Sequence, residues 1–236
     1  MPKRVLLLLA IPMFVLFLAV PQAECHSPGH LFEVYTGKAS FYSDKFHGQK
    51  TANGERYDKK ALTAAHRFLP LGTIVRVTNL SNGNHLLVRI NDRGPRKKNW
   101  IIDVSREAAS RLNMVRRGIA PVQVEVIADR RGRPVQHGTA FFLKVKTIKN
   151  QHEGEAGIAS LRKATRRTSF HSGDHSSPQA SIRLFAERSP QGNMHSFVGI
   201  GPFYRYDKAL AASNKLKQNC PRTDILCIPV SMAMQG

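Results

Sequence analysis

Short apolar runs separated by turn residues dominate residues 35–128. Residues 73–80 (TIVRVTNL) alternate apolar and polar side chains with the two-residue period of a half-buried strand, and residues 86–90 begin another apolar run. The residues between them, 81–84, are Ser, Asn, Gly and Asn, so the pattern predicts a β-hairpin. Further apolar patterns of this region occupy residues 38–42, 62–66, 101–102 and 122–127.

A helix is predicted over residues 105–112. Ser105 is a suitable N-cap, and Ala108, Ala109 and Leu112 fall on one face. The region therefore contains several short strands, one helix and glycine-rich turns, without the regular alternation of strands and helices that a parallel sheet requires. This combination predicts a small closed β-barrel.

The composition changes after residue 128. Residues 129–180 are rich in Gly, Ser, His, Lys and Arg, and apart from a strand pattern at 140–148 they have few large apolar side chains. Such a segment buries too little surface to offset the entropy of ordering it, so it is interpreted as a flexible basic linker. Apolar patterning returns in residues 181–236, which predict a small α+β domain. Its expected elements are strands at 181–186, 196–200 and 225–230 and a helix at 207–217.

The amino terminus predicts export. Lys3 and Arg4 precede an apolar run over residues 5–20, and small residues follow, which is typical of a secretory signal peptide covering residues 1–25. The run is about 16 residues long and contains Pro12, so it is short for a retained membrane span. Cys25 leaves a lipid anchor open, although Glu24 in front of it fits a lipidation signal poorly.

The chain has a formal net charge of +20. A charge of this size favours polyanionic partners such as nucleic acid, acidic lipid or an anionic cell-wall polymer, and the alternative is a solvated basic surface with no special partner. The sequence has no zinc-finger spacing, helix-turn-helix pattern or aromatic RNA-binding signature. Nucleic acid is therefore not expected as a partner, and an anionic membrane surface stays open.

Acidic residues are scarce in the barrel region. Residues 35–104 hold thirteen Lys or Arg but only five acids, namely Asp44, Glu55, Asp58, Asp92 and Asp103. Asp92 lies where an apolar strand ends in the turn Arg93-Gly94-Pro95, a position that is rigid and open.

If the barrel brings residues 55–66 beside this strand end, Glu55, Asp58 and His66 join Asp92 in a cluster suited to acid–base chemistry. The structural alternative is that Asp92 pairs with Arg89 or Arg93, His66 is a hydrogen-bonded core histidine, and Glu55 caps a turn.

Other chemistries find no support in the sequence. It contains no Gly-x-Ser-x-Gly nucleophile elbow, no phosphate-binding glycine loop and no histidine constellation for a metal, so neither a cofactor nor a metal site is expected. Cys220 and Cys227 are candidates for a local disulfide in an exported protein, and a zinc pair lacks further ligands nearby.

The barrel region closely resembles the rare lipoprotein A family of bacterial envelope proteins. The resemblance is nearly continuous over about residues 35–128. The motifs that carry it are GKASFY (37–42), TANGE (51–55), ALTAAH (61–66), LPLGT (69–73), VRVTNL (75–80) and RINDRGP (89–95). It implies a six-stranded double-psi β-barrel and lytic transglycosylase activity on peptidoglycan, preferably on glycan strands without stem peptides. The family's functional residue types are all kept here, at Glu55, Asp58, His66 and Asp92.

The resemblance also implies a mechanism. Asp92 would protonate the bond between N-acetylmuramic acid and N-acetylglucosamine, and the sugar's own 6-hydroxyl would attack to leave a 1,6-anhydro end. One residue can serve first as acid and then as base, while Glu55, Asp58 and His66 tune it and orient the sugar. Tyr42, Phe46 and Trp100 offer stacking surfaces for the sugar or are part of the core.

Residues 181–236 resemble, more weakly, a sporulation-related repeat domain that binds peptide-free glycan at division septa. The telling run is FVGIGPF (197–203) followed by the helix at 207–217. The first strand–helix unit looks shortened, with only residues 187–195 between the strands, so the domain is expected to be degenerate.

Together these features predict an exported, periplasmic or envelope-associated peptidoglycan lytic transglycosylase, with the septal division machinery as a further partner. The alternative is an expansin-like glycan-binding or scaffold protein that does not cut.

Overall fold

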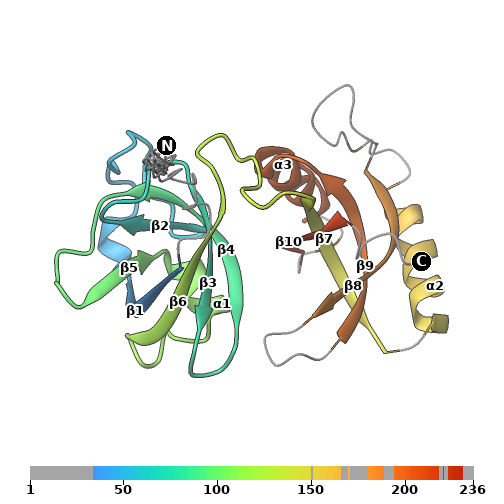
Figure 1. Cartoon of the computed structure of the whole chain (residues 1–236), viewed down its shortest axis with the longest axis horizontal. Coiled ribbons are helices and arrows are strands. Elements are labelled where there is room, and N and C mark those ends of the chain that lie inside the picture. Colours follow the sequence, from blue (N-terminus) through green and yellow to red (C-terminus); the bar gives the residue numbers. More distant parts are fainter. Residues whose placement is uncertain are drawn as a thin grey trace, which may run out of the picture.

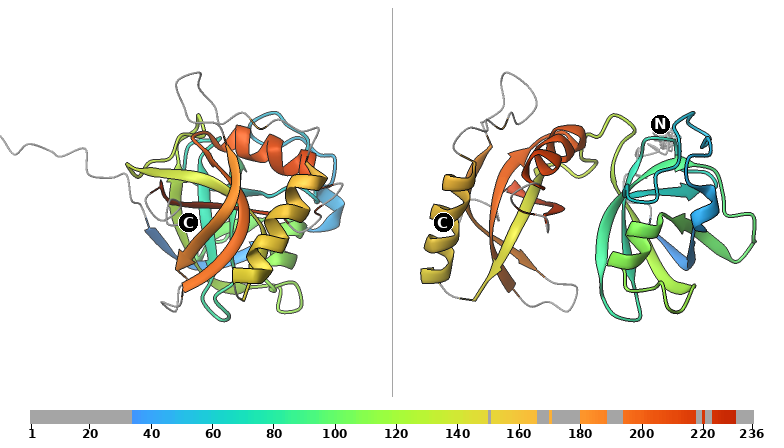
Figure 2. Two further views of the ribbon diagram at one scale, coloured as in Figure 1. Left: turned by 90° about the vertical axis from the view of Figure 1, so that its right-hand side faces the viewer. Right: turned by 180° about the vertical axis from the view of Figure 1, so that it is seen from behind.

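The computed structural model describes residues 34–149, 151–165, 170, 180–188, 194–217, 220 and 223–230. These residues form two β-rich units side by side (Figure 1), which the view from behind also separates (Figure 2). The predicted signal peptide over residues 1–25, including Cys25, lies outside the described residues. Within the described part of the chain, no helix has the length and apolar character needed to cross a bilayer.

The first unit is a closed six-stranded barrel with the strand order β1-β5-β2-β4-β3-β6. Strand β6 pairs back with β1 and closes the cylinder. The strands are β1 (Val34–Phe41), β2 (Thr63–His66), β3 (Ile74–Asn79), β4 (His85–Asp92), β5 (Trp100–Val104) and β6 (Ala120–Ala128). A single turn of 3-10 helix, η1 (Asp44–Phe46), follows β1, and α1 (Arg106–Arg111) follows β5.

The predicted hairpin is confirmed, because β3 and β4 pair in antiparallel fashion around the turn at residues 81–84. Two pairs of strands are parallel, β1 with β5 and β2 with β4, and each joins strands that are distant in the sequence. This mixed, closed arrangement is that of a double-psi β-barrel, as the family resemblance implies.

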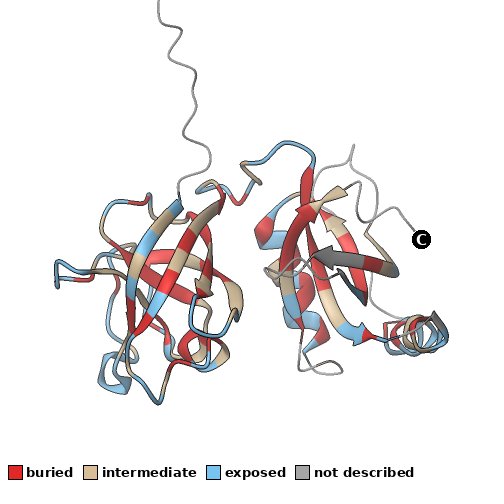
Figure 3. Cartoon of the chain, turned by 60° about the horizontal axis from the view of Figure 1, so that its bottom comes forward, coloured by how far each residue is buried: buried red, intermediate tan, exposed pale blue. Residues whose placement is uncertain are grey.

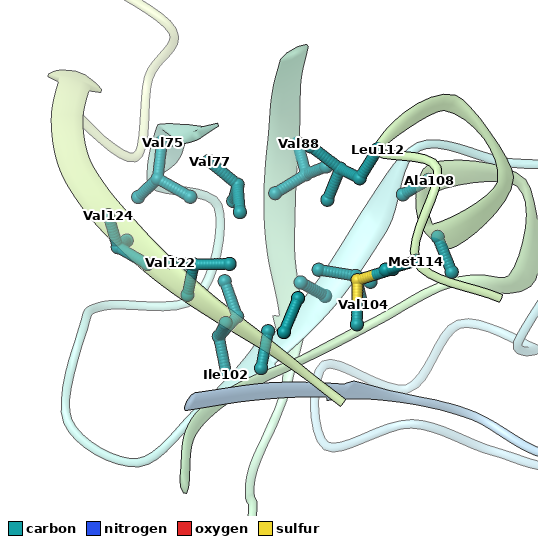
Figure 4. Packing of buried hydrophobic residues seen from close by; sticks show 14 of the residues in the cluster. Val75, Val77, Val88, Ile102, Val104, Ala108, Leu112, Met114, Val122 and Val124 are labelled. Carbon is teal, nitrogen blue, oxygen red and sulfur yellow. The ribbon is translucent and has the colours of Figure 1, made fainter. Parts of the chain in front are cut away.

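Much of the barrel core comes from alternate strand residues. Val75 and Val77 of β3 and Val122 and Val124 of the neighbouring strand β6 point into the interior, where Ala108 of helix α1 joins the same cluster (Figure 4). The predicted N-cap is present, since the Ser105 hydroxyl accepts a hydrogen bond from the Ala108 backbone N–H at 3.2 Å. Figure 3 shows the result of this alternation, with buried and exposed residues following one another along the strands.

The second unit is an antiparallel sheet with the strand order β10-β7-β9-β8 and two helices. Its elements are β7 (Thr139–Ile148), α2 (Gln151–Ala164), β8 (Ser181–Arg188), β9 (Met194–Phe203), α3 (Tyr206–Leu216) and β10 (Asp224–Pro229). They follow one another as β-α-β-β-α-β.

The strand predicted at 140–148 is confirmed as β7, whereas the interpretation of residues 129–180 as a flexible linker is wrong for α2 and for β7 as part of the sheet. Strand β7 carries the fully buried Phe141, Phe142 and Leu143 and is an inner strand of the sheet. The glycines that suggested flexibility instead allow close packing: a Cβ at Gly154 would lie 2.9 Å from a methyl group of Leu184, and one at Gly157 would lie 2.9 Å from Val198.

The expected shortening of the first strand–helix unit is also wrong. That unit is formed by β7 and α2, which precede residue 181, while β8 and β9 form the antiparallel pair at the centre of the element order. The boundary at 181 divides one sheet, because β7 pairs with both β9 and β10.

The two units share a hydrophobic cluster. Ile74 and Leu87 of the barrel pack in the same cluster as Phe141 and Tyr206 of the second unit. Arg76 reinforces the contact, since its Nη2 donates a hydrogen bond to the Cys227 carbonyl oxygen at 3.1 Å. The barrel and the sheet are thus held together by buried apolar surface as well as by the chain between them.

The predicted disulfide between Cys220 and Cys227 is not formed, since both cysteines are free in this structure. Strand β10 places the Cys227 side chain in the cluster that the two units share, and Cys220 packs against the same cluster. Burial raises the pKa of the Cys227 thiol to about 11.

Candidate active site

Asp92 lies at the end of β4, as predicted, and accepts three hydrogen bonds. Its Oδ1 accepts from the backbone N–H groups of Ala52 and Arg93, both at 2.8 Å. Its Oδ2 accepts from the Tyr42 hydroxyl at 2.6 Å. The carboxylate is half-buried and is therefore fixed in orientation while it stays accessible.

Tyr42 is positioned by the strand pair beside it. It follows β1, and its backbone N–H donates to the Val104 carbonyl oxygen at 3.1 Å. Its ring lies between Phe46 and Tyr57, at centroid distances of 5.8 and 4.7 Å. Burial, and then the hydrogen bond to Asp92, raise the pKa of Tyr42 well above its usual value, so the hydroxyl stays protonated and acts as a donor.

A second carboxyl, which sequence reasoning did not assign to the site, faces Asp92 across one strand. In the sheet register, Ala65 of β2 pairs with Asp92 on β4 and with Asp103 on β5. Because paired residues point to the same side of a sheet, both carboxyls flank the small side chain of Ala65. The hydroxyl of Ser40 donates a hydrogen bond to Asp103 Oδ1.

The environment of Asp103 favours its protonated form. Burial raises the pKa of this carboxyl, and the charge of Asp92 adds to the effect, while Ser40 and Arg67 oppose it. Asp103 is one of the five acids noted in the sequence, but only the register of β2 with both its neighbours reveals its relation to Asp92.

The space between the two carboxyls is bordered by small residues. Gly94 has a φ of +147°, and a Cβ there would lie 3.6 Å from both the Ala65 Cβ and Asp103 Oδ2. A side chain at position 94 would therefore be strained and would enter this space. Asp103, whose pKa is raised, and Asp92, which three donors hold, thus lie on either side of Ala65 with Gly94 beside them.

Glu55 lies next to this centre. Loop residues 51–55 attach to β4 through the Ala52–Asp92 hydrogen bond and through the Asn53 N–H, which donates to the Asn91 carbonyl oxygen at 3.1 Å. Glu55 forms a bidentate ion pair with Arg89, at 2.9 and 2.7 Å, which is the main reason that its pKa is lowered. The sequence-based alternative paired Asp92 with Arg89 or Arg93, whereas the structure pairs Arg89 with Glu55.

His66 ends β2 and is buried, with 3% of its surface exposed. Its Nδ1 accepts a hydrogen bond from the Leu69 N–H at 3.0 Å, and its ring packs against Tyr35 at 5.3 Å. Arg93, the residue after Asp92, donates to the His66 carbonyl oxygen at 3.3 Å. The histidine thus lies on the strand adjacent to Asp92 and supports the turn that follows it.

Asp58 and Trp100 contact residues other than Asp92 and Asp103. Asp58 is exposed, accepts from the Lys60 N–H at 2.9 Å and lies 4.0 Å from His47 Nδ1. Trp100 begins β5, and Lys97 Nζ lies 4.3 Å from the centre of its ring. Of the predicted stacking residues, Phe46 is 36% exposed. Across the described residues, no group of three or more His, Cys, Asp or Glu side chains could hold a metal ion.

Comparisons with known proteins concern the barrel region. Residues 34–124 match the protein-family model described as "Lytic transglycolase". The chain is 48% identical over 121 residues to a protein of Neisseria meningitidis named endolytic peptidoglycan transglycosylase RlpA, covering 51% of each chain. It is 55% identical over 113 residues to the protein of the same name from Campylobacter jejuni, covering 47% of this chain and 41% of that one. The chain thus spans about half the length of the curated relatives that it matches.

Solved structures show more distant likeness. The Streptomyces papain inhibitor is 24% identical with a TM-score of 0.34, over 41% of this chain and 96% of that one. A Clavibacter michiganensis expansin in complex with cellohexaose is 12% identical with a TM-score of 0.35, over 74% of this chain and 92% of that one.

The closed six-stranded barrel is therefore a double-psi β-barrel, and residues 34–124 within it match the lytic transglycolase family model. Over this region the chain is similar to the RlpA proteins of Neisseria meningitidis and Campylobacter jejuni.

Proposed function

We propose that the chain is an endolytic peptidoglycan lytic transglycosylase that cleaves the β-1,4 bond between N-acetylmuramic acid and N-acetylglucosamine. The observation that carries the proposal is the pair of carboxyls, Asp92 and Asp103, on either side of Ala65. Burial raises the pKa of Asp103, and three hydrogen-bond donors hold the carboxyl of Asp92 in place, so the pair offers an acid and a base for glycosidic cleavage. The relatives' names support the same reaction class.

In this proposal, one carboxyl acts as the general acid and the other as the general base. Asp103, with its raised pKa, gives its proton to the glycosidic oxygen as the bond from the muramic C1 to that oxygen breaks. The 6-hydroxyl of the same muramic residue attacks C1 and gives its proton to Asp92, so the product carries a 1,6-anhydro ring and no water is consumed. Solvent returns the proton from Asp92 to Asp103 before the next cycle. From the sequence, both steps were expected of Asp92, and the position of Asp103 allows them to be divided between two carboxyls.

The other site residues have supporting roles in this proposal. Tyr42 holds Asp92 through its hydroxyl, and Glu55 fixes Arg89 beside the centre. His66 maintains the turn that orients Asp92 through the contact of its carbonyl oxygen with Arg93. Phe46 and Trp100 offer partly exposed rings to sugar faces, and Asp58 acts at a distance from the acid–base pair.

The cellular setting is part of the proposal. An enzyme of this kind acts in the periplasm or on the envelope, which fits a cleaved signal peptide over residues 1–25 and leaves lipidation of Cys25 open. The net charge of +20 suits an anionic wall or membrane surface, and the second unit is a candidate for glycan binding and septal targeting.

Digestion of purified sacculi tests the reaction directly. Mass spectrometry of the products from the mature protein should show muropeptides with 1,6-anhydro ends. Hydrolysed reducing ends would contradict the transglycosylase reaction. Binding to sacculi without any cleavage would instead support the expansin-like alternative.

A further inference from the structure

Arg67 connects the end of β2 to the loop between β4 and β5. Its Nε donates a hydrogen bond to the Pro95 carbonyl oxygen at 2.8 Å, and its Nη2 donates to the carbonyl oxygens of Trp100, at 2.8 Å, and of Lys97. Arg67 directly follows β2 and is half-buried. A guanidinium group presents several N–H donors in a fixed plane, so this one side chain can hold three carbonyl oxygens at once.

A second arginine makes the opposite connection. Arg93, the residue after β4, donates through Nη1 to the Leu69 carbonyl oxygen at 2.9 Å and to that of His66 at 3.3 Å. Residues 66–69 and 93–100 therefore each supply an arginine to the carbonyl oxygens of the other segment. Hydrogen bonds from charged donors are stronger than neutral ones, so this reciprocal contact fixes the two segments against each other.

The register of β2 brings Arg67 toward the Asp103 carboxyl. Ala65 pairs with Asp103 and His66 with Ile102 in the antiparallel ladder of β2 and β5. The alternation of side chains, continued past the end of β2, places Arg67 on the side of the sheet that carries Ala65 and Asp103. Burial is the largest influence on the pKa of Asp103 and raises it, whereas the positive charge of Arg67 lowers it.

The polar groups around the Asp103 carboxyl come from three neighbouring strands and their ends. They are Ser40 of β1, Tyr42 after β1, Asp92 of β4 and Arg67 after β2. In this set Arg67 is the cation, so it opposes the combined effect of burial and the negative charge of Asp92. Without this cation Asp103 would be a weaker acid, and a general acid is most effective when its pKa lies near the working pH.

We propose that Arg67 is a positioning residue for the general acid Asp103. Its guanidinium group holds the loop after β4 by the backbone carbonyl oxygens and presents a positive charge to the Asp103 carboxyl. The inference rests on the proposed function, in which Asp103 gives its proton to the glycosidic oxygen. One side chain thereby sets both the border of the site and the strength of its acid.

Two substitutions separate the charge of Arg67 from its hydrogen bonds. Arg67→Gln removes the charge. Arg67→Lys keeps the charge but lacks the planar fork that reaches three carbonyl oxygens. The matched control is Arg96→Gln, which removes an equal charge from an exposed position in the same loop. All three variants would be made in the full mature chain, and thermal midpoints show whether they are folded.

The pH profile of anhydro-muropeptide release tests the charge. In Arg67→Gln, the fall in rate that follows loss of the Asp103 proton should move to higher pH, and kcat at lower pH should decrease by up to about tenfold because the acid is weaker. Arg67→Lys and Arg96→Gln should keep this fall at the wild-type pH. An equal displacement in Arg67→Gln and Arg96→Gln, or in both Arg67 variants, would overturn the proposal.

Trp100 reports on the loop, because it is the single tryptophan of the chain. Acrylamide quenching of its fluorescence should increase in both Arg67 variants, which lose hydrogen bonds to the loop, and should stay unchanged in Arg96→Gln. Unchanged quenching in both Arg67 variants would contradict the positioning role.

An NMR titration of isotope-labelled Asp carboxyl carbons makes the test independent of catalysis. The signal of Asp103, identified by its loss in Asp103→Asn, should titrate at higher pH in Arg67→Gln than in the wild type and at an unchanged pH in Arg67→Lys. An unchanged titration in Arg67→Gln would overturn the proposal. Absence of anhydro products from the wild type would instead contradict the proposed function, and the titration would still decide whether the charge of Arg67 acts on Asp103.

Discussion

Asp92 and Asp103 face the same residue, Ala65, from the two strands that flank β2. Their surroundings differ: three hydrogen-bond donors hold Asp92, whereas burial dominates around Asp103 and raises its pKa. The pair is therefore asymmetric before any substrate binds, and for this reason the proposed function gives the role of base to Asp92 and the role of acid to Asp103.

Replacing Asp92 with Asn should lower the rate of anhydro-muropeptide release from sacculi by about 10²- to 10⁴-fold, the usual contribution of a general acid or base. The amide oxygen can still accept from the two backbone N–H groups, so the thermal midpoint should change little. Asp44→Asn, the same substitution on the exposed η1 turn, is the control and should keep full activity. An active Asp92→Asn variant would refute the assignment of Asp92.

Replacing Asp103 with Asn should change the pH dependence of activity. In the wild type, the rate should fall as the pH rises through the raised pKa of Asp103, because the proton donor is lost. The variant should be much slower and should lack this alkaline limb. A slow variant that retains the limb would show that another group is the acid.

The same substitution gives a prediction for stability. A carboxyl whose pKa is raised by folding destabilises the folded state progressively as the pH rises from its ordinary value of 3.8 through the raised one. Asp103→Asn should therefore raise the thermal midpoint at pH 7 relative to the wild type and leave it nearly unchanged at pH 3. A lower midpoint at pH 7 would contradict the sign of this argument.

Replacing Tyr42 with Phe removes the hydroxyl that donates to Asp92 at 2.6 Å. A hydrogen bond to a charged group is worth about 1.5–3 kcal/mol, so we expect kcat on isolated glycan strands to fall about tenfold or more. KM should change by less than about twofold, because the ring and its packing against Tyr57 remain. Tyr204→Phe in the second unit is the matched control. A change confined to KM would mean that Tyr42 contacts the sugar rather than Asp92.

Truncating the chain after residue 138 should leave a barrel with exposed apolar surface. Ile74, Leu87 and Ile127 are buried in the cluster that the second unit completes. Exposing them costs about 25 cal/mol for each Å² of apolar surface, so the truncated barrel should have a lower thermal midpoint than the full mature chain and should aggregate on heating. An equal midpoint would show that the barrel does not depend on the shared cluster.

Local signals in the sequence predicted much of the barrel. The alternation in residues 73–80, the turn at 81–84 and the N-cap at Ser105 all act within a few residues, and each is present in the structure. Asp92 was placed correctly for the same reason, because the apolar run and the Gly94-Pro95 turn fix the end of β4.

The pairing of strands that lie far apart in the sequence could not be predicted from such local signals. The relation of Asp103 to Asp92 depends on the position of β2 between β4 and β5. The residues of each strand and of its adjacent loops do not determine this position. The linker interpretation failed for a related reason. Glycines such as Gly154 and Gly157 are typical of flexible segments. Only the packing of α2 against Leu184 and Val198 shows why small residues are needed there.

The cluster shared by the barrel and the sheet also has a consequence for how the two units could act on one ligand. Because Leu87 and Phe141 lie in one packed cluster, the separation between Asp92 and the second unit is set by folding rather than by a tether. Under the proposed function, a glycan strand that binds the second unit would be cut at a set distance from it, so the released fragments would favour particular lengths.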